Sequence, residues 1–140
     1  MIQTEDGPRV IEMTVRLSGG FDCQFLVPAA TGKNILKAAI LTALGKPFEA
    51  ELLHDNKKKV SISKSLWPLP GKITKIKGIE KAKKQKGFEF IHFRYNVGDI
   101  VVPYTDCAKR VCFIIASGED LIDAKKNMAS IVDLIEIDTT

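Results

Sequence analysis

The sequence predicts an α+β fold in which a strand hairpin and a helix precede a small antiparallel sheet covered by helices. Two patterns carry this prediction. Most of the second half consists of short runs rich in β-branched and aromatic residues, separated by turn residues. Two other segments have apolar residues at helical spacing, with capping residues beside them. The 140 residues suit one ordinary domain, but are few for an enzyme that binds a nucleotide and two substrates.

The first predicted element is a hairpin. The sequence Asp6-Gly7-Pro8 favours a turn that leads into a strand from about Arg9 to Leu17. The residues before the turn are expected to be the end of a partner strand. Polar and apolar residues alternate along this run, so a strand would have one polar and one apolar face. The polar face would carry Glu12, Thr14 and Arg16, and the run stops at Gly19 and Gly20.

The clearest helix is predicted at residues 31–44. Thr31 is the expected N-cap, and Gly45 followed by Pro47 ends the helix. We expect this helix to lie in the core, because its apolar residues share one face. They are Ile35, Leu36, Ala39, Ile40, Ala43 and Leu44.

The composition changes after this helix, so we place a domain boundary near residues 55–60. The chain is thereby divided into residues 1–55 and residues 56–140. In the second unit the sequence predicts two short strands, at residues 60–63 and 72–79, and an exposed helical turn that ends at Gly87. Three β-rich runs follow and suggest an antiparallel meander, at residues 88–95, 99–103 and 110–117.

A last helix is predicted within residues 117–137. Ser117, with Asp120 three residues later, has the pattern of an N-terminal cap. The helix should lie across the sheet, because its apolar residues again share one face. They are Leu121, Ala124, Met128, Ile131 and Ile135.

Composition argues against several classes of protein. No apolar run approaches the roughly 18 residues of a membrane span, and the N-terminus has no signal-peptide pattern. The cytoplasm is therefore the expected location. Cys23, Cys107 and Cys112 lack metal-binding spacing and are expected to be reduced core thiols. His54 and His92 have no neighbouring ligand set, which argues against a metal–histidine site.

The formal charge of +4 hides an uneven distribution. The segment from Lys57 to Lys86 contains eleven lysines and one acidic residue, Glu80, and so carries +10. Such a cluster suits nucleic acid or an acidic partner. The segment has no arginine and one aromatic residue, Trp67, whereas nucleic-acid readout favours arginine forks and stacked aromatics. We therefore favour a solvated lysine-rich face, and keep a non-catalytic binding or assembly module as an alternative function.

The residue types from Glu12 to Gly20 suit a metal and phosphate site. Glu12 can supply a carboxylate oxygen to Mg²⁺, and Thr14 a weaker hydroxyl oxygen. Arg16 has the planar fork that binds phosphate or carboxylate through two hydrogen bonds. Glycines such as Gly19 and Gly20 let backbone N–H groups approach an anion. The spacing alone is weak support, because alternating charged residues are common on half-exposed strands.

The same residues carry a family resemblance. PRVIEMTVRLSGG resembles the strand near the end of the ATP-grasp nucleotide-binding fold, whose pattern is glutamate, spacer, asparagine, spacer, arginine and a glycine-bearing turn. FLVPAATGKNILKAAILTALGKPF resembles the helix that follows. The segments PLPGKITKIKGIEKAKK and VGDIVVPYTDCAKRVCFIIASGEDLIDAKKNMASIV are similar to the C-terminal domain of carboxylate–amine ligases, including the amino-acid ligase group, and distantly to that of biotin carboxylase.

The resemblance implies a role for each residue. Glu12 would bind the Mg²⁺, or Mn²⁺, that bridges to the ATP phosphates. Arg16 would be catalytic and would stabilise the transferring phosphoryl group or an acyl-phosphate. Gly19 and Gly20 would shape the adjoining loop, and Thr14, where the family has asparagine, would be a second metal ligand. The implied reaction has two steps, in which ATP phosphorylates a carboxylate and an amine then displaces phosphate.

The resemblance also implies a partner. The other nucleotide-binding parts of the family lie upstream of such a strand, so we expect an upstream segment or a companion subunit to complete the site. The isolated chain should be inactive, and its exposed apolar surface would favour association, including a homo-oligomer. The substrates would be a small carboxylate and an amine. Biotin carboxylation is a further alternative, disfavoured because the matching domain is short and no biotin-accepting lysine motif is present.

Overall fold

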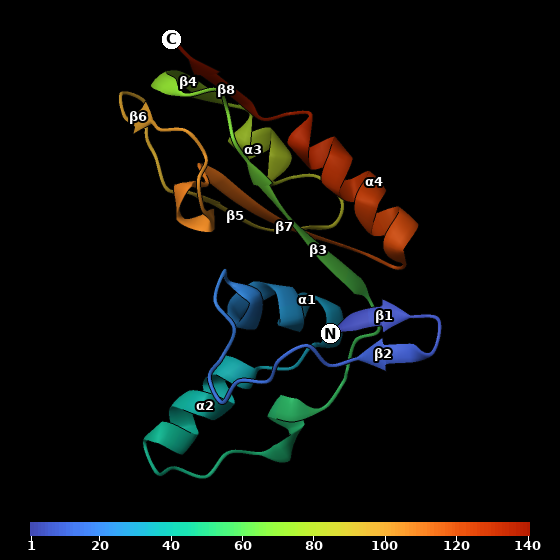
Figure 1. Ribbon diagram of the computed structural model, residues 1–140. Coiled ribbons are helices and arrows are strands. Elements are labelled where there is room, and N and C mark those ends of the chain that lie inside the picture. The colour runs from blue at the N-terminus through green and yellow to red at the C-terminus, as the bar shows by residue number, and fades with distance from the viewer.

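The computed structural model describes residues 1–140 (Figure 1). Its first elements are β1 (Ile2–Thr4), β2 (Gly7–Arg9), the π-helical turn η1 (Asp22–Leu26), α1 (Val27–Thr31), α2 (Ile35–Ala43) and the 3-10 turn η2 (Ala50–Leu53). The later elements are β3 (Val60–Leu66), β4 (Gly71–Lys77), α3 (Ile79–Ala82), β5 (Phe88–Phe93), β6 (Ile100–Val101), the 3-10 turn η3 (Cys107–Lys109), β7 (Cys112–Gly118), α4 (Leu121–Val132) and β8 (Glu136–Thr139). The predicted α+β class is confirmed.

The main sheet is antiparallel and has the strand order β3–β7–β5. All of β7 is buried, because it is hydrogen-bonded on both edges and covered on both faces. On one face, Cys112, Ile114 and Ala116 of β7 pack against Met128 and Ile131 of α4. Figure 1 shows α4 lying along this sheet, as predicted. The other face is covered by η1 and α1.

A second antiparallel sheet has the order β6–β4–β8, and its core contains Ile73, Val101 and Val111. The predicted meander is wrong, because β6 pairs with β4 while β5 pairs with β7. The reason is the composition of β7. A run that is apolar on both faces is most stable in the centre of a sheet, where two partner strands and two covering layers remove it from water.

The predicted positions of two helix starts are also wrong. The side chain of Asn34 caps α2 by accepting a hydrogen bond from the Lys37 backbone N–H at 3.0 Å, while Thr31 ends α1. Asp120 caps α4 by accepting from the Asp123 backbone N–H at 2.8 Å. Ser117 belongs to β7 instead, because the strand that Cys112 begins continues to Gly118.

The two apolar helix faces predicted from the sequence differ in their burial. The expectation that α2 lies in the core is wrong, since Ala38 is its only buried residue and Ile40 and Leu44 are 52% and 62% exposed. Helix α2 packs mainly against the turns η1 and η2, which leave these side chains exposed. In α4, by contrast, the predicted face is largely buried, although Ile135 lies beyond the helix end at Val132.

The N-terminal hairpin is confirmed, but the long strand from Arg9 to Leu17 is not. Strands β1 and β2 pair through Ile2–Arg9 and Thr4–Gly7, and β2 ends at Arg9. Residues 10–17 have no strand structure, because no other strand of the chain lies beside them to accept their backbone hydrogen bonds. Figure 1 shows the hairpin projecting from the body of the molecule. None of the helices is both long and apolar enough to span a bilayer.

Candidate functional site

The segment from Glu12 to Gly20 is exposed and irregular. The Thr14 hydroxyl oxygen accepts a hydrogen bond from the Arg16 backbone N–H at 3.4 Å, and the Arg16 guanidinium donates to the Leu17 carbonyl at 3.1 Å. The expectation of one shared polar strand face is wrong, because the segment forms no strand. The guanidinium of Arg16 forms no ion pair, and Glu12 forms neither an ion pair nor a side-chain hydrogen bond.

Glu12 and Thr14 fit a magnesium site by donor type, but not by donor number. Both carry the oxygen atoms that Mg²⁺ prefers. However, the structure contains no group of three His, Cys, Asp or Glu side chains that could hold a metal ion. Glu12 and Thr14 alone would therefore provide only part of a coordination shell for Mg²⁺.

The end of the segment is fixed by a short network of side chains. The Ser18 hydroxyl donates to the Asp22 carboxylate at 2.6 Å, and the Cys23 thiol donates to the Ser18 carbonyl at 3.3 Å. Gly20 has a φ of 69°, in the left-handed region that favours glycine. Gly19 has open space around it. The predicted glycine turn is thus present, and it directs the chain from the exposed segment into η1.

Phe21 connects this turn to the main sheet. It is the only non-glycine residue with a positive φ, 67°, a conformation that costs about 1–2 kcal/mol for a residue with a side chain. Its ring packs against Phe90 and His92 of β5, with centroids 4.8 Å and 5.2 Å away, and reaches Phe113 of β7 at 6.0 Å. These aromatic contacts stabilise the strained backbone and hold the end of the Glu12–Gly20 segment against the sheet.

A cavity of about 310 Å³ opens beside Gly20 and Phe21. Sequence reasoning missed its polar lining, which includes His92, Arg94 and Arg110. One signal could have found the two arginines: Arg94 directly follows β5 and Arg110 lies two residues before β7. Since β5 and β7 are antiparallel neighbours, residues at these strand ends lie side by side. The Arg94 backbone N–H indeed donates to the Val111 carbonyl at 2.9 Å.

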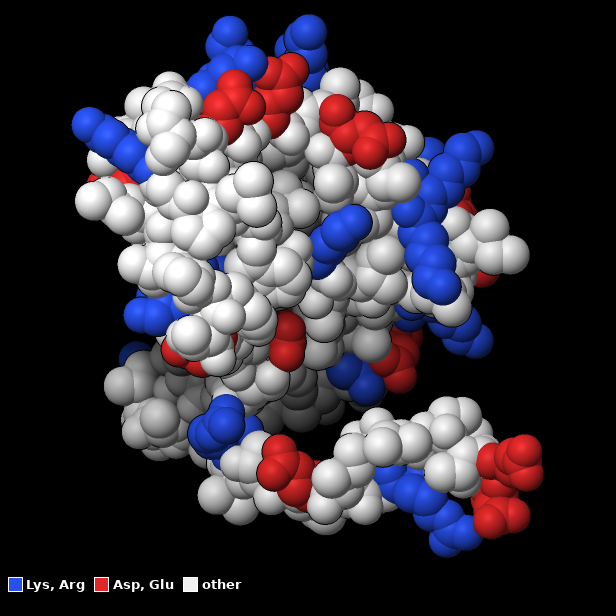
Figure 2. Space-filling model, turned by 45° about the horizontal axis from the view of Figure 1, so that its top comes forward, with Lys and Arg blue, Asp and Glu red and all other residues white.

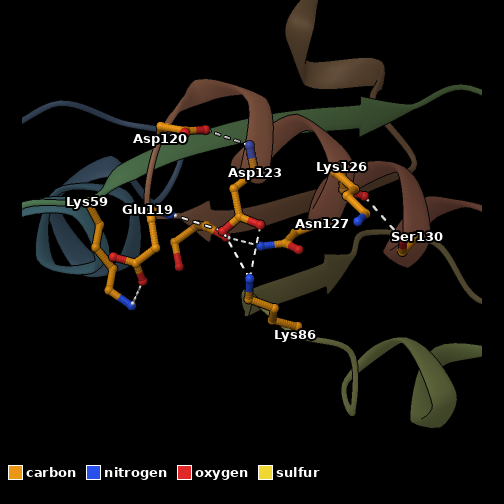
Figure 3. Close-up of polar contacts among 9 residues, drawn as sticks. Lys59, Lys86, Glu119, Asp120, Asp123, Lys126, Asn127 and Ser130 are labelled. Carbon is orange, nitrogen blue, oxygen red and sulfur yellow. Dashed lines mark hydrogen bonds and ion pairs between the residues drawn. The ribbon is translucent and has the colours of Figure 1, made fainter.

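A separate polar cluster lies where β7 meets α4 (Figure 3). The ammonium of Lys86 contacts the Asp123 carboxylate at 3.0 Å, and the Glu119 backbone N–H donates to the same carboxylate at 3.1 Å. The hydrogen bond from Lys86 lowers the pKa of Asp123, and the backbone hydrogen bond lowers it further. The Asn127 amide donates to the Ser117 carbonyl at 2.8 Å. This cluster fixes the start of α4 to the end of β7, and we assign it to stability.

The cysteines differ in their surroundings. Cys23 and Cys112 are buried, and desolvation raises the pKa of the Cys112 thiol to about 12, so this thiol is protonated at neutral pH. The expectation of a core position is wrong for Cys107, which is exposed in the turn η3. No disulfide is formed.

The lysine-rich segment is partly neutralised by ion pairs. Lys59 pairs with Glu119, Lys75 with Glu136 and Asp138, and Lys83 with Glu80, in addition to the pair between Lys86 and Asp123. Figure 2 shows Lys and Arg interspersed with Asp and Glu over the face that it presents. The free positive charge is therefore smaller than the sequence count suggests, which supports the solvated-face interpretation over a nucleic-acid site.

The comparisons with known proteins identify the family. The sequence model of the family described as L-amino acid ligase C-terminal domain 2 matches residues 66–140, from the end of β3 to the last residue. The chain belongs to this family. Arg94 and Arg110 thus lie within the L-amino acid ligase C-terminal domain 2, whereas Gly20 and Phe21 precede it. None of the curated proteins compared with this sequence matches it.

Two solved structures share the fold over most of the chain. The crystal structure of L-amino acid ligase from Bacillus licheniformis has a TM-score of 0.68 and 18% sequence identity, covering 87% of this chain and 30% of that chain. The crystal structure of phosphoribosylglycinamide synthetase from Anaerococcus prevotii has a TM-score of 0.69 and 17% identity, covering 82% of this chain and 30% of that chain. The predicted identity, the C-terminal part of an ATP-grasp ligase, is confirmed at the level of family and fold. This chain spans 30% of the length of either protein.

Proposed function

We propose that this chain is the C-terminal part of an ATP-dependent carboxylate–amine ligase. The observation that carries the proposal is the connection between two features: a domain of the L-amino acid ligase family, and an exposed Glu12–Gly20 segment that Phe21 fixes to that domain's sheet. A ligase that activates a carboxylate with ATP needs a metal ligand and a cationic fork near the phosphates. This segment offers both types of group.

The site would be completed by an upstream ATP-grasp segment or a companion subunit. Two observations support such a partner. The fold neighbours are nearly three times as long as this chain, whose matched part covers 30% of each. Ile11, Met13 and Val15 are 66%, 89% and 110% exposed, so their burial by a partner would remove apolar surface from water.

Each residue of the segment has a proposed role. Glu12 and the Thr14 hydroxyl would hold Mg²⁺ together with ligands from the partner. The bound metal would neutralise charge on the phosphate oxygens. Arg16 would orient the phosphoryl group through its fork and stabilise the negative charge that spreads over its oxygens. Gly19 and Gly20 would leave room for the backbone to approach the bound anion.

The proposed chemistry proceeds in two steps. A carboxylate oxygen of the first substrate attacks the γ-phosphorus of ATP, the bond to the bridging oxygen breaks, and ADP leaves. The amine nitrogen of the second substrate then attacks the acyl-phosphate carbon, inorganic phosphate leaves, and the nitrogen loses a proton to give the amide. Arg16 acts in both steps by stabilising anionic oxygens in place of water.

The proposal is tested with the chain joined to, or mixed with, an upstream nucleotide-binding segment from an ATP-grasp ligase. Association is first verified by size-exclusion chromatography, and ADP release is then measured with panels of carboxylates and amines. We expect Mg²⁺-dependent ADP release that requires both substrates. Arg16→Ala should lower kcat/KM by about a hundredfold, the size typical of losing one group that stabilises transition-state charge.

Glu12→Ala should weaken Mg-ATP binding in the same assembly. Glu5→Ala is the matched control, because Glu5 is an exposed carboxylate in the turn between β1 and β2 and has no proposed role. Two results together would contradict the proposal: a folded assembly without nucleotide turnover on any substrate pair, and unchanged Mg-ATP affinity after Glu12→Ala.

A further inference from the structure

We infer that the cavity beside Gly20 binds the carboxylate group of an amino acid with an apolar side chain, through Arg94 and Arg110. The assignment of an amino acid rests on the proposed function, since such a ligase needs a site for a carboxylate-bearing substrate. The cavity itself is formed by this chain alone. Its volume of about 310 Å³ lies at the small end of the range for ligand pockets, which suits a ligand of amino-acid size.

The two arginines are oriented but not neutralised. The Arg94 guanidinium donates to the Ala108 carbonyl at 2.7 Å, and the Arg110 guanidinium donates to the Cys107 carbonyl at 2.7 Å. Both are therefore tied to the same short turn, η3, although Arg94 follows β5 and Arg110 precedes β7. Neither forms an ion pair with an acidic side chain. Most of their N–H donors are thus free for an anion.

The nearby carboxylates accept hydrogen bonds from neutral donors, and neither forms an ion pair with the arginines. Asp22, beside Gly20, accepts from the Ser18 hydroxyl at 2.6 Å. Asp106 accepts from the Ala108 backbone N–H at 2.7 Å and from the Thr105 hydroxyl at 3.2 Å. No acidic residue lines the cavity, whereas the two guanidinium groups do. An entering carboxylate would supply the missing counter-charge.

The aromatic walls favour an organic acid over free phosphate. Phe21 and Phe113 line the cavity, and the Arg110 guanidinium lies 5.1 Å from the Phe113 ring centroid. A guanidinium over a ring face keeps the N–H donors along its edge, and their fork matches the two oxygens of a carboxylate. An apolar side chain on the same ligand could cover the exposed parts of the rings, whereas phosphate would gain nothing from them.

The position of the cavity fits this role. Gly20 lines it, and Arg16, the proposed phosphoryl contact, lies four residues earlier in the same anchored segment. The cavity lining is thus adjacent in sequence to the proposed phosphate-binding groups. Phe21 contributes to both, since its backbone ends the segment and its ring forms a wall of the cavity.

The test is an NMR titration of the complete ¹⁵N-labelled 140-residue chain. L-Phenylalanine is the probe, L-phenylalaninamide is the matched compound without the carboxylate, and inorganic phosphate is the matched anion without an apolar group. We expect saturable shifts with L-phenylalanine at Gly20, Arg94 and Arg110. Phenylalaninamide and phosphate should each bind at least about tenfold more weakly, because each lacks one of the two matched features.

Variants assign the effect to the cavity. Arg94→Gln and Arg110→Gln should each weaken L-phenylalanine binding about tenfold. Arg110→Lys should fall between the wild-type protein and Arg110→Gln, since it keeps the charge and loses the fork. Arg9→Gln is the control and should not change binding, because Arg9 pairs with Asp6 in the hairpin and lies outside the cavity.

Several outcomes would overturn the inference. These are tighter binding of phosphate than of L-phenylalanine, equal binding of phenylalaninamide, or no saturable shift up to about 10 mM, above the usual range of KM values. The comparison of the three probes on the wild-type chain decides the matter even if an arginine variant unfolds. Binding is measured without ATP or a partner, so its failure can be told apart from failure of the ligase assay.

Discussion

Residues 9–17 and residues 110–118 both begin with an Arg-Val pair and continue with β-prone apolar residues, yet they reach opposite states. The second run forms β7, hydrogen-bonded to β3 and β5 and buried on both faces. The first run belongs to β2 only at Arg9, and the residues after it are exposed, with Met13 at 89%. The difference shows that strand propensity becomes a strand only where partner strands satisfy the backbone and a covering layer buries the side chains.

The largest expected contrast between these regions comes from cavity formation. Ile114→Ala in β7 should lower the free energy of unfolding by about 2–5 kcal/mol, because the side chain is fully buried against α4. Ile11→Ala should change it by less than about 0.5 kcal/mol, because that side chain is 66% exposed. Urea unfolding followed by circular dichroism measures both. Similar losses at the two positions would mean that residues 10–17 pack as part of the core.

A second contrast compares alanine substitution at Gly78, which is closely packed, with the same substitution at Gly7 in the hairpin. Gly78 has a φ of 87°, and a Cβ at this position would overlap the Leu134 carbonyl oxygen, so Gly78→Ala should cost about 2–4 kcal/mol. Gly7 in the hairpin has a φ of 102° but open space around it. Gly7→Ala should therefore strain only the hairpin and leave the main unfolding transition unchanged. Thermal unfolding of both variants checks this, and a large drop in Tm for Gly7→Ala would show that the hairpin is coupled to the core.

Phe21 lies at the junction of the two regions. At this position the usual stability order, alanine variant above glycine variant, should be reversed. Phe21→Ala loses the ring contacts and keeps the left-handed strain, whereas Phe21→Gly loses the same contacts and relieves the strain. Phe21→Gly should therefore be more stable than Phe21→Ala by about 1 kcal/mol. Chemical denaturation of the pair decides the point. The usual order, with alanine more stable than glycine, would contradict the assigned backbone conformation.

The smallest effect concerns acid stability. Lys86 and the Glu119 backbone N–H lower the pKa of Asp123 in the folded state. The stability that ionised Asp123 contributes is therefore complete above the ordinary aspartate pKa of about 4. It is lost as the pH falls through the lower pKa of the folded state. Asp123→Asn should therefore lower Tm at neutral pH and flatten its decrease in acid. Asp6→Asn in the hairpin is the control and should change neither. The measurement is Tm against pH, and an unchanged acid slope in Asp123→Asn would refute the assignment.

The sequence predicted the elements that local patterns specify. The runs in β4, β5 and β7 and the apolar face of α4 were each recognised, because alternation, continuous apolarity and helical spacing depend on neighbouring residues alone. The N-cap positions were displaced by three residues, since Thr31, Asn34, Ser117 and Asp120 all have side chains that can cap a helix. Only the surrounding structure decides which of them does so.

The arrangement of the strands and the cavity could not be predicted in the same way. The central position of β7 follows from contacts between residues far apart in sequence, such as Val60 with Gly118. Arg94 and Arg110 carry no shared motif, and they meet only because β5 and β7 are neighbours. For the Glu12–Gly20 segment, residue types suggested the chemistry. The strand expected there would need a partner that this chain does not provide.

The strand order has a consequence for synthesis. In the β3–β7–β5 sheet the central strand is the last of the three to be made, and β3 and β5 have no hydrogen bonds with each other. Until residues 112–118 leave the ribosome, the two outer strands lack a partner and the rings of Phe90 and Phe21 lack the complete surface on which they pack. The chain must therefore gain most of its stability late, after a long period with unpaired strand edges, which is when association with another chain would compete with folding.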